Sequence, residues 1–249
     1  MNLVIGTAGW SIPARDAAAF PADGASLERY AARLAGAEIN SSFHRPHRRS
    51  TWEKWAASVP PHFRFSVKLP KTITHQLKLR GCTEPLRQHL ADAGALGAKL
   101  AVHLVQLPPS LAYDEALADS FFAEMRELAG AAAIACEPRH PSWFEPAADS
   151  LLERRQVARV AADPARVPAA AQPGGWRGLA YFRLHGSPVM YRSSYRDGRL
   201  EAYADRLRDA GATGWCIFDN TASSEAMGDA LALLTLLDER GRSRGTEAG

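Results

Sequence analysis

The stretch GLAYFRLHG (residues 178–186) shows the pattern from which the fold is predicted, a β-like run that ends in charged side chains and a turn glycine. Apolar and aromatic residues over so short a span favour a buried strand, and Gly186 marks its end. Other stretches have the same form, a β-like run that ends in polar or charged residues beside a turn signal. They are LVIGTAGW (3–10), GAEINSS (36–42), FRFSVKLP (63–70), LAVHLVQLPP (100–109), AAIACEPRH (132–140), VARVAADP (157–164) and GWCIFDNT (214–221).

Segments with helical periodicity lie between most of these runs. Eight strands that alternate with helices in 249 residues predict an α/β fold, a single (β/α)8 TIM barrel with eight parallel strands. The sixth unit is the exception, because a Pro- and Gly-rich sequence follows Asp163 as far as Gly175 and predicts a shortened or irregular connection. We expect residues 1–240 to form the barrel and residues 241–249 to form a disordered C-terminal tail.

Composition indicates one globular domain. The chain is 46% hydrophobic, which is enough to bury a large core. It has no run of 18 apolar residues and no charged segment before an apolar one near its start, so we predict no membrane span, no signal peptide and a cytoplasmic location. Cys82, Cys136 and Cys216 lack metal-ligand spacing and are interpreted as small core residues in a reducing compartment.

Basic residues are concentrated in three loops although the net charge is only +3. The loops after the second, third and seventh predicted strands contain a single acid, Asp197, among their basic side chains. These are Arg45, Arg48, Arg49, Lys68, Lys71, Lys78, Arg80, Arg183, Arg192, Arg196 and Arg199. In a barrel these loops open on one face, where the positive field would favour an anionic ligand. The alternative is that they are solvated charges paired with acids elsewhere in the fold.

Strand alternation predicts which polar residues share the barrel interior, because successive side chains point to opposite sides of a strand. His103 has the opposite parity from Gln106 and is expected to pack on the helix side. The residues predicted to point inward at the strand ends are Glu38, Asn40, Lys68, Glu137, Arg139, Arg183 and His185.

The inward set contains the groups needed for acid–base chemistry on an anion. Glu38 and Glu137 are candidate catalytic carboxylates, and His185 is a candidate proton shuttle. The candidate substrate-binding residues are Asn40, Lys68, His75, Gln106, Arg139, His140, Arg183, Tyr195 and Asn220. The alternative is a buried network in which Glu137 neutralises Arg139 or Arg183 and Glu38 neutralises Lys68.

The sequence favours catalysis without a metal or other cofactor. Several His, Asp and Glu residues are available, but none has HxH, HxxxH or HExxH spacing. Arg and Lys share the strands of the best candidate ligands and would oppose a cation there. A divalent metal is the alternative.

Six short motifs resemble, in order, those of the domain-of-unknown-function 72 (YecE-like) family. They are GTAGW, EINSSF, FSVKLPKTITH, QLPPS, EPRHPSW and YFRLHG, and the resemblance extends from about residue 3 to residue 235. It implies a TIM-barrel fold and a site at these positions but no particular reaction. The chain departs from the family pattern at His44, where an aromatic residue is usual, and at Asp219 in the FNN-like ending of the last strand. It also lacks a second Trp after Trp10.

Two classes of function follow from this sequence. The first is a metal-independent enzyme with hydrolase- or lyase-type acid–base chemistry, acting on a phosphorylated or other anionic substrate such as a nucleic-acid phosphodiester. The second is a non-catalytic module that binds nucleic acid or a phosphorylated metabolite. A Schiff-base lyase that uses Lys68 is a third interpretation. The expected partners are an anionic small molecule or nucleic acid, and no membrane.

Overall fold

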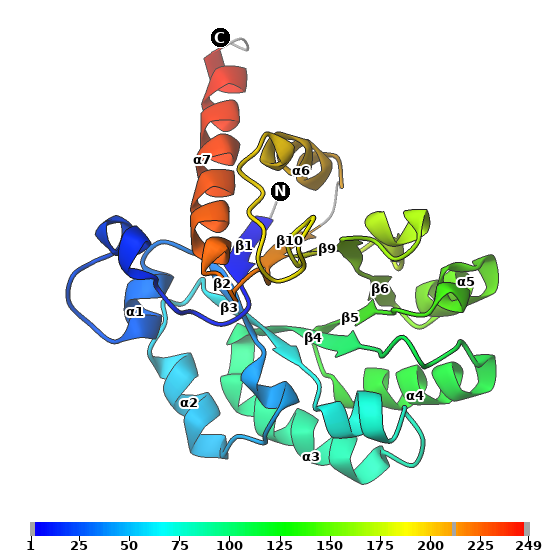
Figure 1. Ribbon diagram of the computed structural model, residues 1–249. Helices are drawn as coiled ribbons and strands as arrows, with labels where there is room; N and C mark the ends of the chain where they lie inside the picture. The colour runs from blue at the N-terminus through cyan, green and yellow to red at the C-terminus, as the bar shows by residue number, and fades with distance from the viewer. Residues whose placement is uncertain (1–2, 211–212, 247–249) are drawn as a thin grey trace.

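The computed structural model of the chain describes residues 3–210 and 213–246. Figure 1 shows the strands at the centre of the molecule, with helices arranged around them and α7 extending toward the C-terminus. The helices are α1 (Ser26–Ala31), α2 (Arg49–Ala57), α3 (Thr83–Ala93), α4 (Glu115–Leu128), α5 (Pro146–Arg154), α6 (Arg199–Asp209) and α7 (Glu225–Thr246). None of the helices in the described residues is long and apolar enough to cross a membrane.

The strands form two sheets. The first has the order β1 (Leu3–Thr7), β10 (Thr213–Phe218), β9 (Leu179–Leu184), β7 (Ala161–Asp163). The second has the order β2 (Gly36–Ile39), β3 (Arg64–Lys68), β4 (Leu100–Gln106), β5 (Ala133–Glu137), β6 (Val157–Arg159), β8 (Gly174–Gly175). The α/β class is therefore confirmed, but the hydrogen bonds do not form one continuous sheet of eight parallel strands.

The departure from a single parallel sheet has two local causes. At Val160 the chain changes its pairing partner, so that β6 pairs with β5 and β7 pairs with β9. The short strand β8 then pairs with β6 in the antiparallel direction, whereas the other strand pairs are parallel. Between β1 and β2 the ladder is reduced to an isolated parallel bridge from Ala8 to Glu38.

The sixth unit is irregular, as its sequence predicted. Residues 164–178 contain a 3-10 turn, η6 (Pro168–Ala171), and β8, but no α-helix. At the C-terminus α7 continues to Thr246, beyond the expected boundary at residue 240, since no proline interrupts the sequence there. The remainder of the predicted tail, residues 247–249, lies outside the described residues.

Strands β1 and β2 approach each other so closely that only glycine fits between them. A Cβ atom on Gly6 would lie 2.2 Å from the carbonyl oxygen of Gly36, and one on Gly36 would lie 2.3 Å from Val4 Cγ1. The Tyr30 hydroxyl joins the two strands, because it accepts from the Thr7 amide at 2.9 Å and donates to the Gly36 carbonyl at 2.9 Å. This contact and the isolated bridge hold the two sheets together on this side.

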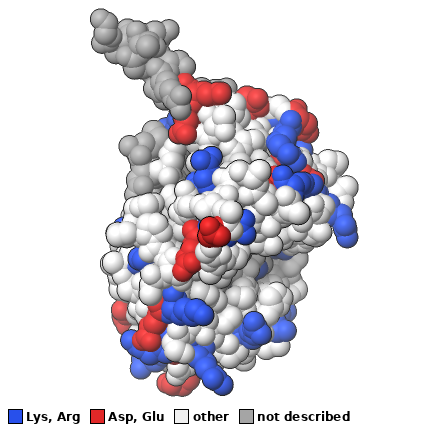
Figure 2. Space-filling view, turned by 90° about the vertical axis from the view of Figure 1, so that its left-hand side faces the viewer, with Lys and Arg blue, Asp and Glu red and all other residues white. Residues whose placement is uncertain are grey.

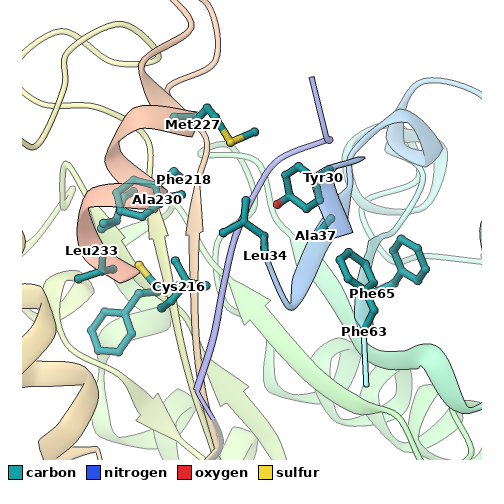
Figure 3. Packing of buried hydrophobic residues seen from close by; sticks show 14 of the residues in the cluster. Tyr30, Leu34, Ala37, Phe63, Phe65, Cys216, Phe218, Met227, Ala230 and Leu233 are labelled. Carbon is teal, nitrogen blue, oxygen red and sulfur yellow. The ribbon is translucent and has the colours of Figure 1, made fainter. Parts of the chain in front are cut away.

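Alternation along the strands separates two apolar regions. Side chains such as Leu104, Tyr181 and Trp215 form a cluster between the strands, which supports the inward parity predicted for their neighbours. On the other side of β10, Phe218 packs against Met227 and other residues of α7, as Figure 3 shows. The three cysteines are buried and form no disulfide. The polar strand ends therefore lie directly above a packed apolar interior.

Replacing Gly6 with Ala should destabilise the protein, because its methyl group meets the backbone of Gly36 rather than a movable side chain. We expect a loss of about 1–3 kcal/mol in the free energy of unfolding, the usual cost of overpacking, measured by urea denaturation. Gly94→Ala is the matched control, since its Cβ would contact nothing within 4 Å and its φ is −57°. An equal effect of the two substitutions would contradict the close approach of β1 and β2.

Candidate functional site

The guanidinium of Arg183 lies at the centre of the polar strand ends and is fully buried. Its Nε and Nη2 atoms donate to the two oxygens of Glu38 at 3.0 and 2.7 Å. Its Nη1 atom donates to Glu137, and Nη2 also donates to Asp219 Oδ2 at 2.9 Å. A single side chain from β9 thereby binds carboxylates from β2, from β5 and from the residue after β10. We call these four residues the Arg183 network.

His185 lies between two carboxylates of this network. Its Nδ1 is 3.0 Å from Asp219 Oδ2, and its Nε2 is 3.2 Å from Glu137 Oε1. Burial acts to lower the pKa of His185, but the attraction of Glu137 and the hydrogen bond to Asp219 outweigh it and raise that pKa above its ordinary value. The surroundings therefore favour an imidazolium that donates from both ring nitrogens.

Both candidate catalytic glutamates are saturated with donors. Glu137 accepts from Gln106 Nε2 at 3.1 Å and from Arg139 Nε at 3.0 Å, in addition to Arg183. Burial acts to raise its pKa, but the neighbouring cations, Arg183 foremost, hold it well below the ordinary value. Glu38 is fully buried, and its Oε2 lies 2.9 Å from the Tyr181 hydroxyl. Glu137, with its pKa lowered by these cations, is therefore a poor proton acceptor.

Lys68 differs from the other cations because it lacks a counterion. Among the described residues its Nζ atom makes no hydrogen bond or ion pair, and it lies 4.2 Å from the centroid of the Phe43 ring. Its side chain is only 7% exposed. Burial and, to a smaller extent, the charge of Arg183 lower the pKa of Lys68 from 10.5 to about 8, although the carboxylates of the Arg183 network partly oppose the shift.

Three further predicted residues surround Lys68 and Glu137. Burial and then the charges of Lys68 and Arg139 lower the pKa of His75, which places its imidazole in their field. Asn40 Nδ2 lies 3.4 Å from Asp219 Oδ1, while its own Oδ1 is buried and has no partner among the described residues. Arg139 Nη2 is 3.0 Å from Glu137 Oε1 but forms no aligned hydrogen bond. Lys68, Arg139 and Asn40 thus retain hydrogen-bonding capacity.

A small cavity gives access to the network beside Glu137, Arg139 and His185. Its volume is about 300 Å³ including the opening to solvent, and the rest of its lining is made by Pro138, Ala162, Pro164, Arg166, Ala170 and Met190. The Tyr191 ring lies edge-on to His185, with centroids 5.7 Å apart. The loop that follows β9 therefore covers His185.

Three residues predicted to bind substrate instead hold loops in place. His140 Nδ1 accepts from the Ser142 amide at 3.2 Å, at the start of the turn η5 (Pro141–Phe144). The Tyr195 hydroxyl accepts from Gly186 N and donates to the Asp163 carbonyl. Asn220 Nδ2 donates to the Ser193 carbonyl at 2.9 Å and to a carboxylate of α7 at 2.7 Å. The structure therefore does not turn these side chains toward the Arg183 network.

Asp219 was not among the predicted site residues, although it binds both Arg183 and His185. The signal was present in the sequence: Trp215 and Ile217 point into the interior, and the same alternation places Asp219 inward. Tyr181 has the same inward parity as Arg183, two residues later, but was assigned no role. Phe43 was not among the predicted site residues either, and its position beside Lys68 depends on the turn η2 (Ser41–Phe43). His103 lies on the helix side. Burial, and then the charges of His89 in α3 and Arg126 in α4, lower its pKa to about 3.

Many of the loop cations have acidic partners, which limits the predicted positive field. The paired residues among them are Arg49, Arg80, Arg183, Arg196 and Arg199. On the molecular face shown in Figure 2, basic and acidic side chains lie beside one another. The buried-network alternative is also correct in part: Glu137 pairs with both Arg139 and Arg183, although Glu38 pairs with Arg183 rather than with Lys68.

The carboxylates at the strand ends surround a guanidinium. Within residues 3–210 and 213–246, no group of three or more His, Cys, Asp and Glu side chains is arranged to hold a metal ion. The positive charge of Arg183 occupies the position between Glu38, Glu137 and Asp219, where it neutralises carboxylates that would otherwise repel one another.

The comparison with known proteins identifies the family. The family described as "Protein of unknown function DUF72" matches residues 4–248. The chain belongs to the DUF72 family. It is 30% identical over 150 residues to the UPF0759 protein YecE of Escherichia coli strain K12, an alignment that covers 58% of this chain and 54% of YecE. The match thus spans about half the length of that curated relative.

Solved structures of DUF72 proteins have the same fold. The protein from Thermotoga maritima MSB8 matches with a TM-score of 0.78 and 20% identity, covering 96% of this chain and 100% of that one. The protein from Enterococcus faecalis V583 gives a TM-score of 0.78 and 18% identity, with 95% of each chain covered. An IolI protein with a bound zinc atom matches at a TM-score of 0.57 and 9% identity over 96% of each chain. This DUF72 chain therefore has a TIM-barrel-like α/β fold.

Removing the central cation should cost more stability than removing an exposed one. Arg183→Met leaves three carboxylates buried without their shared partner, and we expect a loss of about 3–5 kcal/mol in the free energy of unfolding at pH 7. Arg49→Met is the control, because it removes an exposed pair with Glu53 one helical turn away and should change stability by less than about 1 kcal/mol. Urea denaturation measures both, and similar losses would refute a central role for Arg183.

Proposed function

We propose that this DUF72 chain is a metal-independent enzyme that binds a phosphorylated or other anionic substrate at Lys68 and uses His185 for proton transfer. The observation that carries the proposal is the ammonium of Lys68, which is enclosed at the strand ends without a counterion. The carboxylates nearby are bound to Arg183 instead. The site thus retains one buried cation for a ligand to neutralise.

Anion binding at Lys68 is favoured because, in the unliganded site, the ammonium is buried without a partner among the described residues. Burying a charged group without a partner is unfavourable, which is why the pKa of Lys68 falls to about 8. A phosphate or carboxylate oxygen beside Nζ would stabilise the ammonium and raise that pKa again. Arg139 and His75 lie close enough to Lys68 to share its electrostatic environment and offer further donors.

In this proposal His185 is the general acid and the two glutamates are not the base. The imidazolium borders the cavity beside Glu137 and Arg139, so a substrate there would lie next to a charged donor. Glu137 has a pKa well below its ordinary value, and its charge stabilises the imidazolium. Glu38 positions Arg183 through both of its oxygens. A nucleic-acid phosphodiester is among the substrates that fit these roles.

The proposal also treats the two sheets as one ring of eight strands. If β6 and β7 are counted as one strand interrupted at Val160, each strand of the ring is parallel to its neighbours. The Ala8–Glu38 bridge then joins β1 to β2 and completes the ring. This arrangement would place Lys68, Glu137 and His185 at one shared mouth.

We propose a cytoplasmic location as part of the same assignment. The buried thiols of Cys82, Cys136 and Cys216 form no disulfides and suit a reducing compartment. The proposed partners are anionic small molecules or nucleic acid.

One observation favours a second candidate, a binding module without catalysis. Arg183 engages all three carboxylates of its network, so none is free to act as a base. Such a module would use the Lys68 cation to hold a phosphorylated metabolite or nucleic acid without turning it over. Binding and turnover experiments on the same variants separate the two candidates.

Lys68→Met should weaken the binding of inorganic phosphate by about tenfold or more, since a charge-assisted hydrogen bond is lost. Isothermal titration calorimetry at pH 7 measures this affinity, and Lys71→Met, an exposed lysine of the next loop, is the matched control. The wild-type affinity should fall as the pH rises through and above about 8, because the neutral amine no longer attracts the anion. Equal affinities of wild type and Lys68→Met would refute the anion site.

His185→Gln should reduce the hydrolysis of a dithymidine phosphodiester, whose alkoxide leaving group must take up a proton, by about 100-fold while leaving phosphate binding intact, because a general acid contributes on that scale. Retained phosphate binding shows that the variant is folded. Turnover should persist in EDTA, and its loss there would contradict the metal-independent mechanism. Phosphate binding without turnover by the wild-type protein would instead support the binding module.

A further inference from the structure

A second pocket lies next to the candidate site and is lined by Phe43, whose ring also contacts Lys68. Its volume is about 650 Å³ including the opening to solvent. The walls come from the segment 42–47, from Trp52 of α2, from Pro70 after β3 and from His89 of α3. The rings of the lining are those of Phe43, Trp52 and three histidines, His44, His47 and His89, with the Trp52 ring edge-on to His47 at a centroid distance of 5.3 Å.

Two ring nitrogens of the lining residues have no hydrogen-bond partner. Trp52 is 1% exposed and His89 is 7% exposed, yet Trp52 Nε1 and His89 Nε2 are without partners in the part of the chain that the structure describes. Trp52 Nε1 can only donate. His89 is neutral near pH 7, because burial lowers its pKa to about 4, so its Nε2 donates or accepts according to the tautomer. Buried polar atoms of this kind are costly unless a ligand or water satisfies them.

Phe43 connects this pocket to the candidate site. Its ring lines the pocket, and the Lys68 ammonium lies 4.2 Å from the ring centroid. Arg45, which forms no ion pair among the described residues, also lines the pocket. The acid in the lining, Asp92, accepts a hydrogen bond from Gln88 at 2.9 Å. A ligand in the pocket can therefore stack on apolar rings and extend an anionic group past Phe43 to Lys68.

We propose that this pocket binds the base of a nucleotide whose phosphate is held at Lys68. A nucleobase is flat and uncharged and carries ring acceptors, which match the aromatic walls and the free Trp52 N–H. A plain hydrocarbon would leave both ring nitrogens unsatisfied. The placement of the phosphate rests on the proposed function, whereas the binding of the base rests only on the pocket.

Nuclear magnetic resonance of the 15N-labelled full chain tests the base site. The probes are AMP, GMP, CMP and UMP, and the reporter is the indole N–H signal of Trp52, assigned by its loss in Trp52→Phe. We expect at least one nucleotide to shift this signal downfield and to bind Trp52→Phe about tenfold more weakly. Trp176→Phe, which lies outside the pocket, should leave the affinity unchanged. The absence of any shift with all four nucleotides would overturn the proposal.

Two further probes separate this inference from the proposed function. Ribose 5-phosphate carries the phosphate without the base, and the nucleoside of the tightest-binding nucleotide carries the base without the phosphate. A nucleoside that shifts Trp52, with nucleotide binding insensitive to Lys68→Met, would support the base pocket and refute the anion site. Ribose 5-phosphate that binds as tightly as the nucleotide would overturn the base pocket and retain the anion site.

Discussion

The charge of Arg183 is the constraint on which the rest of this site depends. One guanidinium pairs with Glu38, Glu137 and Asp219, which leaves a formal charge of −2 (+1 and −3) on the network, and so joins the ends of β2, β5 and β9 and the residue after β10. Desolvating these ions is expensive, and the cost is offset only because the planar fork reaches both oxygens of Glu38 and a further oxygen on each of the other carboxylates. Arg183 is therefore a fixed structural centre, because four of its five N–H groups donate to carboxylates and its side chain is fully buried.

The remaining charges follow from this arrangement. Glu137 and Asp219 stay ionised beside Arg183, and their negative charges in turn raise the pKa of His185. Lys68 Nζ forms no ion pair among the described residues, although the carboxylates of the network act on it at longer range and partly oppose the fall of its pKa. The site thus combines a rigid network fixed by Arg183 with one buried cation that has no direct partner in the described part of the chain. This division of roles explains why we assign anion binding to Lys68 rather than to Arg183.

The alternation of strands with helices was sufficient to predict the α/β class. The alternation of side chains along each strand was sufficient to predict most of the Arg183 network. Glu38, Glu137, Arg183 and His185 lie together because parity and strand position determine where a side chain at a strand end points. Strand alternation does not apply to Tyr195 and Asn220, which follow β9 and β10 in loops, where the Tyr195 hydroxyl donates to the Asp163 carbonyl and Asn220 Nδ2 donates to the Ser193 carbonyl. The division of the sheet at Val160 could not be predicted, because it depends on which neighbouring strand offers free hydrogen-bonding groups.

Long-range pairing accounts for the other differences between sequence and structure. Arg80 and Asp114 are far apart in the chain, so the excess of loop cations looked larger in the sequence than it is in the fold. The pocket beside Phe43 likewise joins Trp52 and His89 from separate helices. No local pattern marks either of these as part of a site.

The most direct test of the account is a titration of the Lys68 ammonium, followed by NMR of 13C-labelled lysine and assigned with Lys68→Met. The account predicts a pKa of about 8 in the free protein, below the ordinary value of 10.5, and a higher pKa when phosphate is added. A free-protein pKa near 10.5 would contradict an enclosed cation without a counterion. A lowered pKa that phosphate does not change would contradict the anion site.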